Sequence, residues 1–222
     1  MSAPSAVQVR DDLLEAFWKR GLVLFGESVK QEYALNTPVF IDLRHKLYDD
    51  LDTLTELGGA LYRKIMELGK DAASQQVIGI PDTATPIALA AALASRGAAK
   101  PLLYGQMRKQ PASYPGGRAG SSCYMGVVDP TREITLVDDV MASGKTKLWS
   151  REQLKKEGLK VSRILVVVNR EQGGDKILEN QGIPVHSLYK VSELVSYYKA
   201  TGRIDATTAQ AALDHLRSRR FC

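Results

Sequence analysis

The chain has 222 residues, of which 44% are apolar and 25% are charged, and its formal net charge is +5. These proportions match an ordinary globular domain, so they exclude a disordered tail and a coiled coil. The longest apolar stretch, residues 86–94, is too short to cross a membrane, which takes about 18 residues.

The N-terminal part of the chain predicts helices and short strands. Hydrophobic spacing indicates, in chain order, a helix, two short strands and a long amphipathic helix: 11–20, 22–26, 39–43 and 50–68. Leu13, Leu14 and Phe17 form the apolar face of the first helix, and Gly21 and Gly69 end the two helices. The residues before the first helix are expected to be frayed.

From residue 77 onward, strands and helices alternate. Nearly continuous apolar runs predict buried strands at 77–80, 101–105, 133–139, 161–169 and 183–189. Helices are expected at 86–95, 145–157, 174–181, 191–200 and 207–217, with a Gly/Pro/Ser-rich loop over 110–122. The alternation predicts an α/β fold, a doubly wound and mostly parallel sheet. Ligands bind such sheets beyond the carboxyl ends of the strands, so site residues are expected just after strands.

The positive charge is unevenly distributed. Residues 83–128 contain no Asp or Glu, but they contain five basic residues: Arg96, Lys100, Arg108, Lys109 and Arg118. The rest of the chain has 25 basic and 25 acidic residues, so the whole excess lies in this segment. It is either an ordinary basic surface or a pocket for a small polyanion. The basic C-terminal stretch HLRSRRF, residues 215–221, is expected to be a solvated helix end. A nucleic-acid role there would need a second basic stretch with aromatic residues, and none is visible, so no nucleic-acid partner is expected.

The most informative segment is ITLVDDVMASGKT, residues 134–146. Its strand ends at two adjacent carboxylates, Asp138 and Asp139, and a short turn then opens a helix. Helix N-termini attract phosphate through free N–H groups and the helix dipole, and Gly144 allows close approach of the backbone. Hydroxyl groups in the turn can donate further hydrogen bonds. The carboxylates can accept ribose hydroxyls or hold Mg²⁺ through water.

Two other interpretations of this segment fit less well. SGKT could end a Walker A loop, but that motif has a glycine five positions before Gly144, where this chain has Asp139. The acidic pair could also only cap a helix. A double Asp directly after a buried strand is unusual for a cap.

VDDVMASGKT resembles the phosphoribosyl diphosphate (PRPP) signature of type I phosphoribosyltransferases. The flanking sequence resembles, more narrowly, the orotate phosphoribosyltransferase family, over roughly residues 12–215. The matching segments correspond to the family's N-terminal hood, first diphosphate loop, mobile catalytic loop and acceptor-contacting strand: 25–44, 79–88, 108–114 and 157–174.

This resemblance implies the type I phosphoribosyltransferase fold in a single domain, residues 1–222. The implied hood, core and C-terminal helices are approximately 21–45, 50–190 and 191–217. The implied reaction joins orotate and PRPP into orotidine 5′-phosphate and diphosphate, a step of pyrimidine biosynthesis. The resemblance also implies Mg²⁺ as cofactor, and a homodimer whose loop near 108–120 crosses to the partner's site.

The resemblance also gives each candidate residue a role. The implied catalytic residues are Asp138, Asp139, Arg108 and Lys109. The two aspartates are also the implied Mg²⁺ site, through water or PRPP. The implied PRPP-binding residues are Ala142, Ser143, Gly144, Lys145, Thr146, Asp82 and Thr83. The implied acceptor contacts are Arg170, Tyr114 and Phe40.

The chain departs from the family pattern at several charged positions. The hood stretch 31–34, which includes Glu32, replaces a Lys-Ser-Gly stretch whose lysine contacts orotate. A further lysine and an acid of the mobile loop fall on Ala112 and Ser113, and Asn169 replaces an aspartate. Loss of one cation aimed at a leaving group costs on the order of 10²–10³ in rate. Two alternatives therefore stay open: transfer to a different acceptor, and a non-catalytic PRPP-binding regulator.

Other signals in the sequence are weak. No N-terminal signal with basic and apolar parts is visible, so a cytoplasmic protein without a membrane partner is expected. Cys123 and Cys222 give neither a disulfide framework nor a zinc spacing. His45, His186 and His215 also lack metal-ligand spacing, and structural roles are expected for them.

Overall fold

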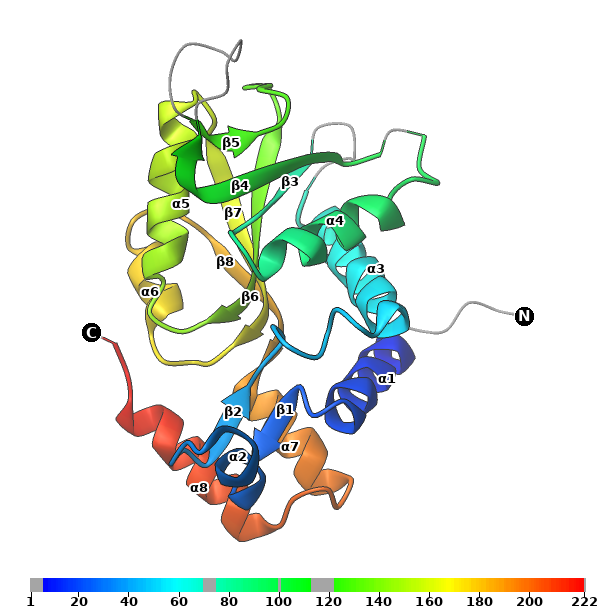
Figure 1. The fold of residues 1–222 in the computed structure, drawn as a ribbon, viewed down its shortest axis with the longest axis vertical. Coiled ribbons are helices and arrows are strands. Elements are labelled where there is room, and N and C mark those ends of the chain that lie inside the picture. The colour runs from blue at the N-terminus through cyan, green and yellow to red at the C-terminus, as the bar shows by residue number, and fades with distance from the viewer. Residues whose placement is uncertain (1–5, 70–74, 100, 113–121, 222) are drawn as a thin grey trace.

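The computed structural model describes residues 6–69, 75–99, 101–112 and 122–221. Within these residues, six strands form one sheet in the order β5-β4-β3-β6-β7-β8 (Figure 1). The strands are β3 (Gln75–Gly79), β4 (Leu103–Ala112), β5 (Ser122–Met125), β6 (Glu133–Met141), β7 (Val161–Asn169) and β8 (Val185–Lys190). β5 is antiparallel to β4, and the other neighbouring pairs are parallel. The expected mostly parallel α/β sheet is confirmed.

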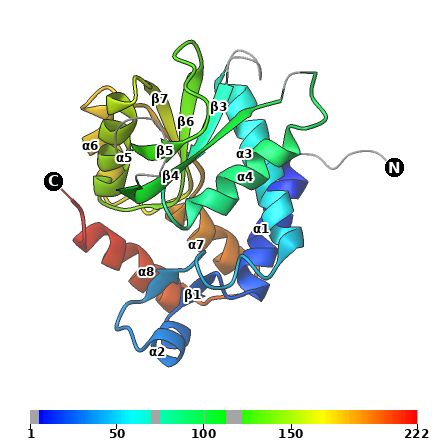
Figure 2. The same cartoon turned by 45° about the horizontal axis from the view of Figure 1, so that its top comes forward.

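Helices cover both faces of this sheet (Figures 1 and 2). They are α3 (Leu51–Leu68) and α4 (Ala84–Ala94) on one face, and α5 (Lys145–Lys156) and α6 (Gly174–Glu179) on the other. Successive side chains of a strand point to opposite faces. Leu165 of β7 therefore joins an apolar cluster with Leu61 of α3, whereas Val166 joins another with Leu154 of α5. No helix in the described residues is long and apolar enough to cross a membrane.

A small hood lies against the carboxyl-terminal edge of the sheet. The elements in and around it are α1 (Ala6–Lys19), β1 (Val23–Phe25), α2 (Glu27–Tyr33), β2 (Val39–Ile41), α7 (Val191–Ala200) and α8 (Ala206–Ser218). β1 and β2 pair antiparallel. The Phe25 ring packs against the rings of Trp18 and Tyr198, and Thr37 is hydrogen-bonded to His215 at 3.1 Å. Helices from both ends of the chain thus hold the hood (Figure 1).

Several elements differ from those expected from the sequence. The first helix begins at Ala6, where a frayed terminus was expected. β4 continues to Ala112, into the expected loop 110–122, and its outer end pairs with β5, a strand that was not predicted from the sequence. α2 occupies part of the segment between the two hood strands. It is a seven-residue helix that ends at Ala34 in the left-handed region, with φ 52°.

Candidate active site

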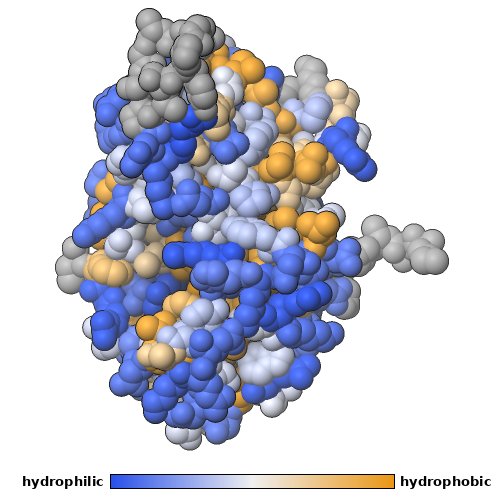
Figure 3. Space-filling model, in the orientation of Figure 1, coloured by the Kyte–Doolittle hydropathy of each residue, from blue (hydrophilic) through white to orange (hydrophobic). Residues whose placement is uncertain are grey.

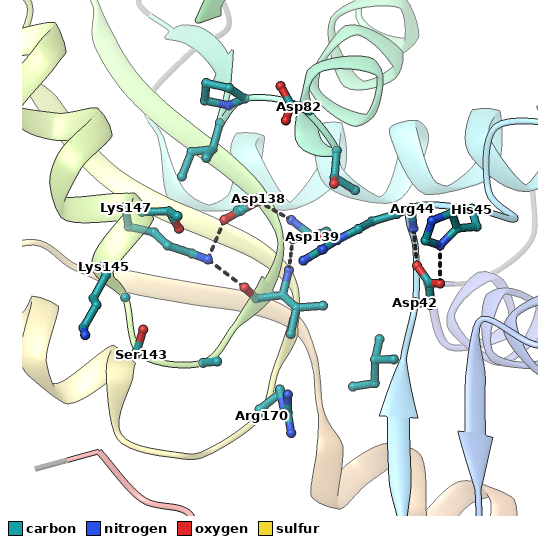
Figure 4. A pocket seen from close by; sticks show the side chains of 18 of the residues that line it. Asp42, Arg44, His45, Asp82, Asp138, Asp139, Ser143, Lys145, Lys147 and Arg170 are labelled. Atoms are coloured by element: carbon teal, nitrogen blue, oxygen red, sulfur yellow. Dashed lines mark hydrogen bonds and ion pairs between the residues drawn. The ribbon is translucent and has the colours of Figure 1, made fainter. Parts of the chain in front are cut away.

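The carboxyl end of β6 carries two adjacent buried carboxylates. Asp138 and Asp139 are 6% and 8% exposed. The Asp139 N–H donates to Asp138 Oδ1 at 2.9 Å, and the Val140 N–H donates to Asp139 Oδ1 at 2.7 Å. The backbone thereby orients one oxygen of each carboxylate. Both residues line a cavity of about 750 Å³ that hood residues also line (Figure 4).

The loop from β6 to α5 forms one wall of the cavity. The residues lining it are those predicted to bind phosphate: Ala142, Ser143, Gly144, Lys145 and Thr146. Gly144 has φ 78°, a left-handed conformation that favours glycine, and α5 begins directly after it. The first N–H groups of a helix have no partner within the helix. This wall therefore combines backbone donors, hydroxyls and an ammonium group, which suits a phosphate.

Lys147, the third residue of α5, is a residue of this cavity that the sequence analysis missed. Its ammonium lies 2.5 Å from Asp138 Oδ2 and donates to the Val140 carbonyl oxygen at 2.7 Å (Figure 4). The side chain is only 5% exposed. Lys147 directly follows the predicted motif, but the sequence does not reveal that its side chain turns back toward β6.

The two carboxylates have different electrostatic surroundings. Burial, followed by the negative charge of Asp138, raises the pKa of Asp139 from 3.8 to about 7. Asp138 has the Lys147 ammonium beside it, which offsets its negative charge. Arg44 Nε lies 3.8 Å from Asp139 Oδ2, but the arginine side chain is 70% exposed, so solvent screens this pair. The site thus holds one firmly paired carboxylate and one that ionises reluctantly.

The loop between β3 and α4 forms a second wall. Asp82 and Thr83 line the cavity, and the peptide bond from Pro81 to Asp82 is cis. The Tyr48 hydroxyl donates to the Thr83 carbonyl oxygen at 2.7 Å. Lys109 Nζ, near the end of β4, lies 2.5 Å from Asp82 Oδ2. The structure therefore brings Lys109 to the cavity of its own chain.

Phe40 of β2 and Arg170, which follows β7, line the cavity from the hood side and the sheet side. The Arg170 N–H donates to the Met141 carbonyl oxygen at 3.0 Å, which anchors it beside the end of β6. Burial lowers the pKa of the Arg170 guanidinium from 12.5. Arginine nevertheless stays protonated in proteins, so Arg170 presents a cation to the cavity.

A polar cluster around Asp42 also lines the cavity, and the sequence analysis did not select it. Asp42 accepts hydrogen bonds from the Tyr33 hydroxyl at 2.7 Å and the Arg44 N–H at 2.8 Å, and its Oδ2 lies 2.6 Å from His45 Nδ1. Burial alone raises the pKa of Asp42, but the hydrogen bonds from His45 and Tyr33 outweigh it, so the net pKa is lowered. Asp42, Arg44 and His45 follow β2, whereas Tyr33 ends α2. Because β2 belongs to the antiparallel hood sheet, the rule for the ends of parallel strands does not point to them.

One predicted residue within the described structure does not line the cavity. The Arg108 guanidinium contacts the Met125 sulfur, and Arg108 is absent from the described cavity lining. Tyr114 and Ser113 lie outside the described residues.

Known proteins are similar to this chain in sequence and in fold. The orotate phosphoribosyltransferase of Aquifex aeolicus (strain VF5) is 30% identical over 188 residues, which cover 84% of this chain and 97% of that protein. The chain belongs to the orotate phosphoribosyltransferase family.

Two further relatives of this family agree. Uridine 5′-monophosphate synthase of Bos taurus is 31% identical over 84% of this chain, and the match covers 36% of that longer protein. The crystal structure of orotate phosphoribosyltransferase from Francisella tularensis superposes with a TM-score of 0.71 at 18% identity. The superposition covers 95% of this chain and 100% of the Francisella tularensis chain. At 18% identity, this similarity shows the fold alone. No protein-family model matches the chain.

As a member of the orotate phosphoribosyltransferase family, the chain compensates some of its departures locally. Glu32, in the hood stretch where the family has a lysine, forms an ion pair with Lys46. Asn169 donates from Nδ2 to Asp175 Oδ2 at 2.9 Å, so a carboxylate still lies beside this position.

Proposed function

We propose that this chain transfers the 5-phosphoribosyl group from PRPP to orotate, which yields orotidine 5′-phosphate and diphosphate. The observation that carries this proposal is one cavity shared by the Asp138–Asp139 pair, the loop 142–146, Phe40 and Arg170. Its volume of about 750 Å³ suits small-molecule ligands. The relatives' names, orotate phosphoribosyltransferase and uridine 5′-monophosphate synthase, support pyrimidine biosynthesis as the pathway.

The wall formed by β6 and α5 would hold the phosphoribosyl group. The loop 142–146 would bind the 5-phosphate through backbone N–H groups, and Asp138 and Asp139 would accept hydrogen bonds from the ribose hydroxyls. Positive charge develops at the anomeric carbon as its bond to diphosphate breaks. An ionised Asp139 would stabilise that charge.

The other walls would bind the leaving group and the acceptor. Asp82 and Thr83 would hold the diphosphate, and Arg108 and Lys109 would add positive charge to this half of the site from the loop that crosses between subunits in the homodimer proposed below. The acceptor would be held by Arg170, Phe40 and Tyr114. The partly buried guanidinium of Arg170 is suited to the carboxylate of orotate, because it can donate two parallel hydrogen bonds.

Mg²⁺ is the cofactor that we propose. Carboxylate oxygens are the hard ligands that Mg²⁺ prefers, and each Asp138 oxygen keeps acceptor capacity beyond its contacts with Lys147 and the Asp139 N–H. Among the described residues, no group of three or more His, Cys, Asp or Glu side chains could hold a metal. Mg²⁺ would therefore be shared with PRPP oxygens and water, and would offset the charge of the leaving diphosphate.

We also propose a homodimer in which the loop near 108–120 crosses to the partner's site. Leu89 and Leu93 of α4 support an interface, because these large apolar side chains are 40% and 56% exposed. The space-filling view shows hydrophobic surface in the region of α4 (Figure 3). The cytoplasmic location and the absence of nucleic-acid and membrane partners remain predictions from the sequence.

A turnover assay tests the reaction. Purified protein with PRPP, Mg²⁺ and orotate should consume orotate, followed as a loss of its absorbance. Calorimetry with PRPP is the accompanying control. Intact PRPP binding without turnover above background would eliminate orotate as the acceptor.

The missing hood lysine favours a second candidate, a phosphoribosyltransferase with a different acceptor. Glu32 of the stretch 31–34 is paired with Lys46 and is absent from the described cavity lining, so this stretch supplies no cation for an anionic acceptor. Turnover of a neutral heterocycle in place of orotate would establish this candidate. A protein that binds PRPP but turns over no acceptor would instead be a regulator.

A further inference from the structure

Lys147 links α5 to β6 in the wall of the cavity. It projects from the first turn of α5, while both of its partners belong to β6 (Figure 4). One partner is the Asp138 carboxylate at 2.5 Å and the other is the Val140 carbonyl oxygen at 2.7 Å. The chain between Val140 and Lys147 contains the whole phosphate loop, so these contacts join the two ends of that loop.

Because Lys147 is buried, its contacts must have good geometry to offset the cost of removing its charge from water. The Lys147 and Asp138 side chains are 5% and 8% exposed. Two charges removed from water are stable only when their geometry is good and further hydrogen bonds satisfy them. Here the Val140 carbonyl oxygen and the Asp139 N–H supply those bonds. The arrangement therefore restricts the Asp138 carboxylate, and the helix turn that carries Lys147, to one geometry.

We propose that Lys147 is a positioning residue for the ribose 5-phosphate half of PRPP. It holds the Asp138 carboxylate in the orientation that accepts ribose hydroxyls, and it fixes the span of the loop 142–146 around the 5-phosphate. The inference rests on the proposed function of the cavity. The diphosphate half would bind at the loop between β3 and α4, which Lys147 does not contact in the described structure.

This division of the site separates a positioning role from a purely structural one. A lysine that only stabilises the fold would affect both halves of the site alike when it is replaced. A positioning lysine would affect ribose 5-phosphate and leave diphosphate unchanged. Calorimetric titration of the two ligands separately, in the same Mg²⁺ buffer, distinguishes these outcomes without measuring turnover.

The test compares wild type with Lys147→Met, and uses Lys155→Met as the control. Lys155 is an exposed lysine near the other end of α5. Lys147→Met should weaken ribose 5-phosphate binding by at least about tenfold, the size of effect typical of residues that orient a ligand-binding group. Diphosphate affinity in Lys147→Met, and both affinities in Lys155→Met, should stay within about twofold of wild type.

Several outcomes would overturn the inference. If folded Lys147→Met binds ribose 5-phosphate as tightly as wild type, Lys147 does not position the ribose 5-phosphate half of PRPP. Equal losses for both ligands would assign it to general stability. Lys147→Gln, which keeps a hydrogen-bond donor, replaces Lys147→Met if that variant does not fold, and failure of both to fold would also assign Lys147 to stability alone. A wild-type protein that binds neither ligand would overturn the proposed function as well.

Discussion

Asp139 has a carboxyl group whose ionisation is opposed by its surroundings. Burial and the neighbouring Asp138 raise its pKa from 3.8 to about 7. A carboxyl with a raised pKa in the folded state binds its proton more tightly there than in the unfolded chain. The free energy of unfolding therefore falls as the pH rises from about 4 to about 7, because the unfolded state loses its proton first.

Asp139→Asn should remove this pH dependence. Thermal unfolding in EDTA and without PRPP should show the variant to be more stable than wild type at pH 8, on the order of 4 kcal/mol, with little difference at pH 4. Asp205→Asn is the control with the opposite sign, because hydrogen bonds from Thr208 lower the pKa of Asp205. Parallel stability curves for Asp139→Asn and wild type would contradict the electrostatic account. A gain in stability with a loss of PRPP binding would be typical of an active-site carboxylate.

The loop between β6 and α5, which we propose binds phosphate, also depends on how closely α6 approaches it. Gly174, the first residue of α6, lies against the loop between β6 and α5. A Cβ at this position would overlap the Ala142 carbonyl oxygen, and backbone cannot give way as the end of a flexible side chain can. The close approach of α6 therefore restricts the position of the loop between β6 and α5. Lys147 restricts the same loop by joining its two ends through its contacts with β6.

Gly174→Ala should consequently affect both folding and binding. Overpacking of this kind typically costs about 1–3 kcal/mol, which urea unfolding would measure. Displacement of the loop should also weaken PRPP binding in calorimetry. Gly97→Ala is the matched control, since a Cβ there would have no heavy atom within 4 Å. Unchanged stability and affinity in Gly174→Ala would mean that the loop can move away at little cost.

The helices and strands that could be predicted from the sequence are those with a clear local hydrophobic pattern. β6 and β7 are long apolar runs with clear ends, so their positions and the parallel sheet followed from the pattern. α2 has only seven residues and a polar sequence, so it depends on its packing with the hood. β5 exists because β4 offers it an edge, and a four-residue strand after a loop rich in glycine gives little local signal.

The site was predictable to the extent that it is contiguous in sequence. Asp138, Asp139 and the loop 142–146 form one run, and their physical chemistry alone pointed to a phosphorylated sugar. The contacts of Arg44 with Asp139 and of Tyr48 with Thr83 join residues far apart in the chain. They arise only when the hood folds over the strand ends, so no local pattern could reveal them.

Across the whole molecule, the positive charge is less concentrated at the cavity than its position in the sequence suggested. Among the described basic residues of the segment 83–128, Lys109 lines the cavity, Arg108 contacts Met125, and Arg96 is exposed. Lys100 and Arg118 lie outside the described residues. Lys145, Lys147 and Arg170 supply cavity cations from outside that segment.

The homodimer proposal makes a prediction that only the whole assembly can satisfy. The family resemblance implies that Arg108 and Lys109 act at the partner's site, whereas Lys109 in this structure lies 2.5 Å from Asp82 of its own chain. Two inactive double variants can be mixed. One carries Asp138→Asn and Asp139→Asn, and the other carries Arg108→Ala and Lys109→Ala. A crossing loop would give each mixed dimer one complete site, because the intact loop of one chain would meet the intact carboxylates of the other.

At equal amounts of the two variants, random exchange of subunits should restore roughly a quarter of the wild-type rate, since half of the dimers are mixed and each has one working site of two. Sedimentation and mass analysis of tagged chains would verify that mixed dimers have formed. Each variant alone, carried through the same exchange, is the control for residual activity. Mixed dimers without recovered activity would show that Lys109 serves its own chain's cavity, as its contact with Asp82 indicates, and that the loop does not cross.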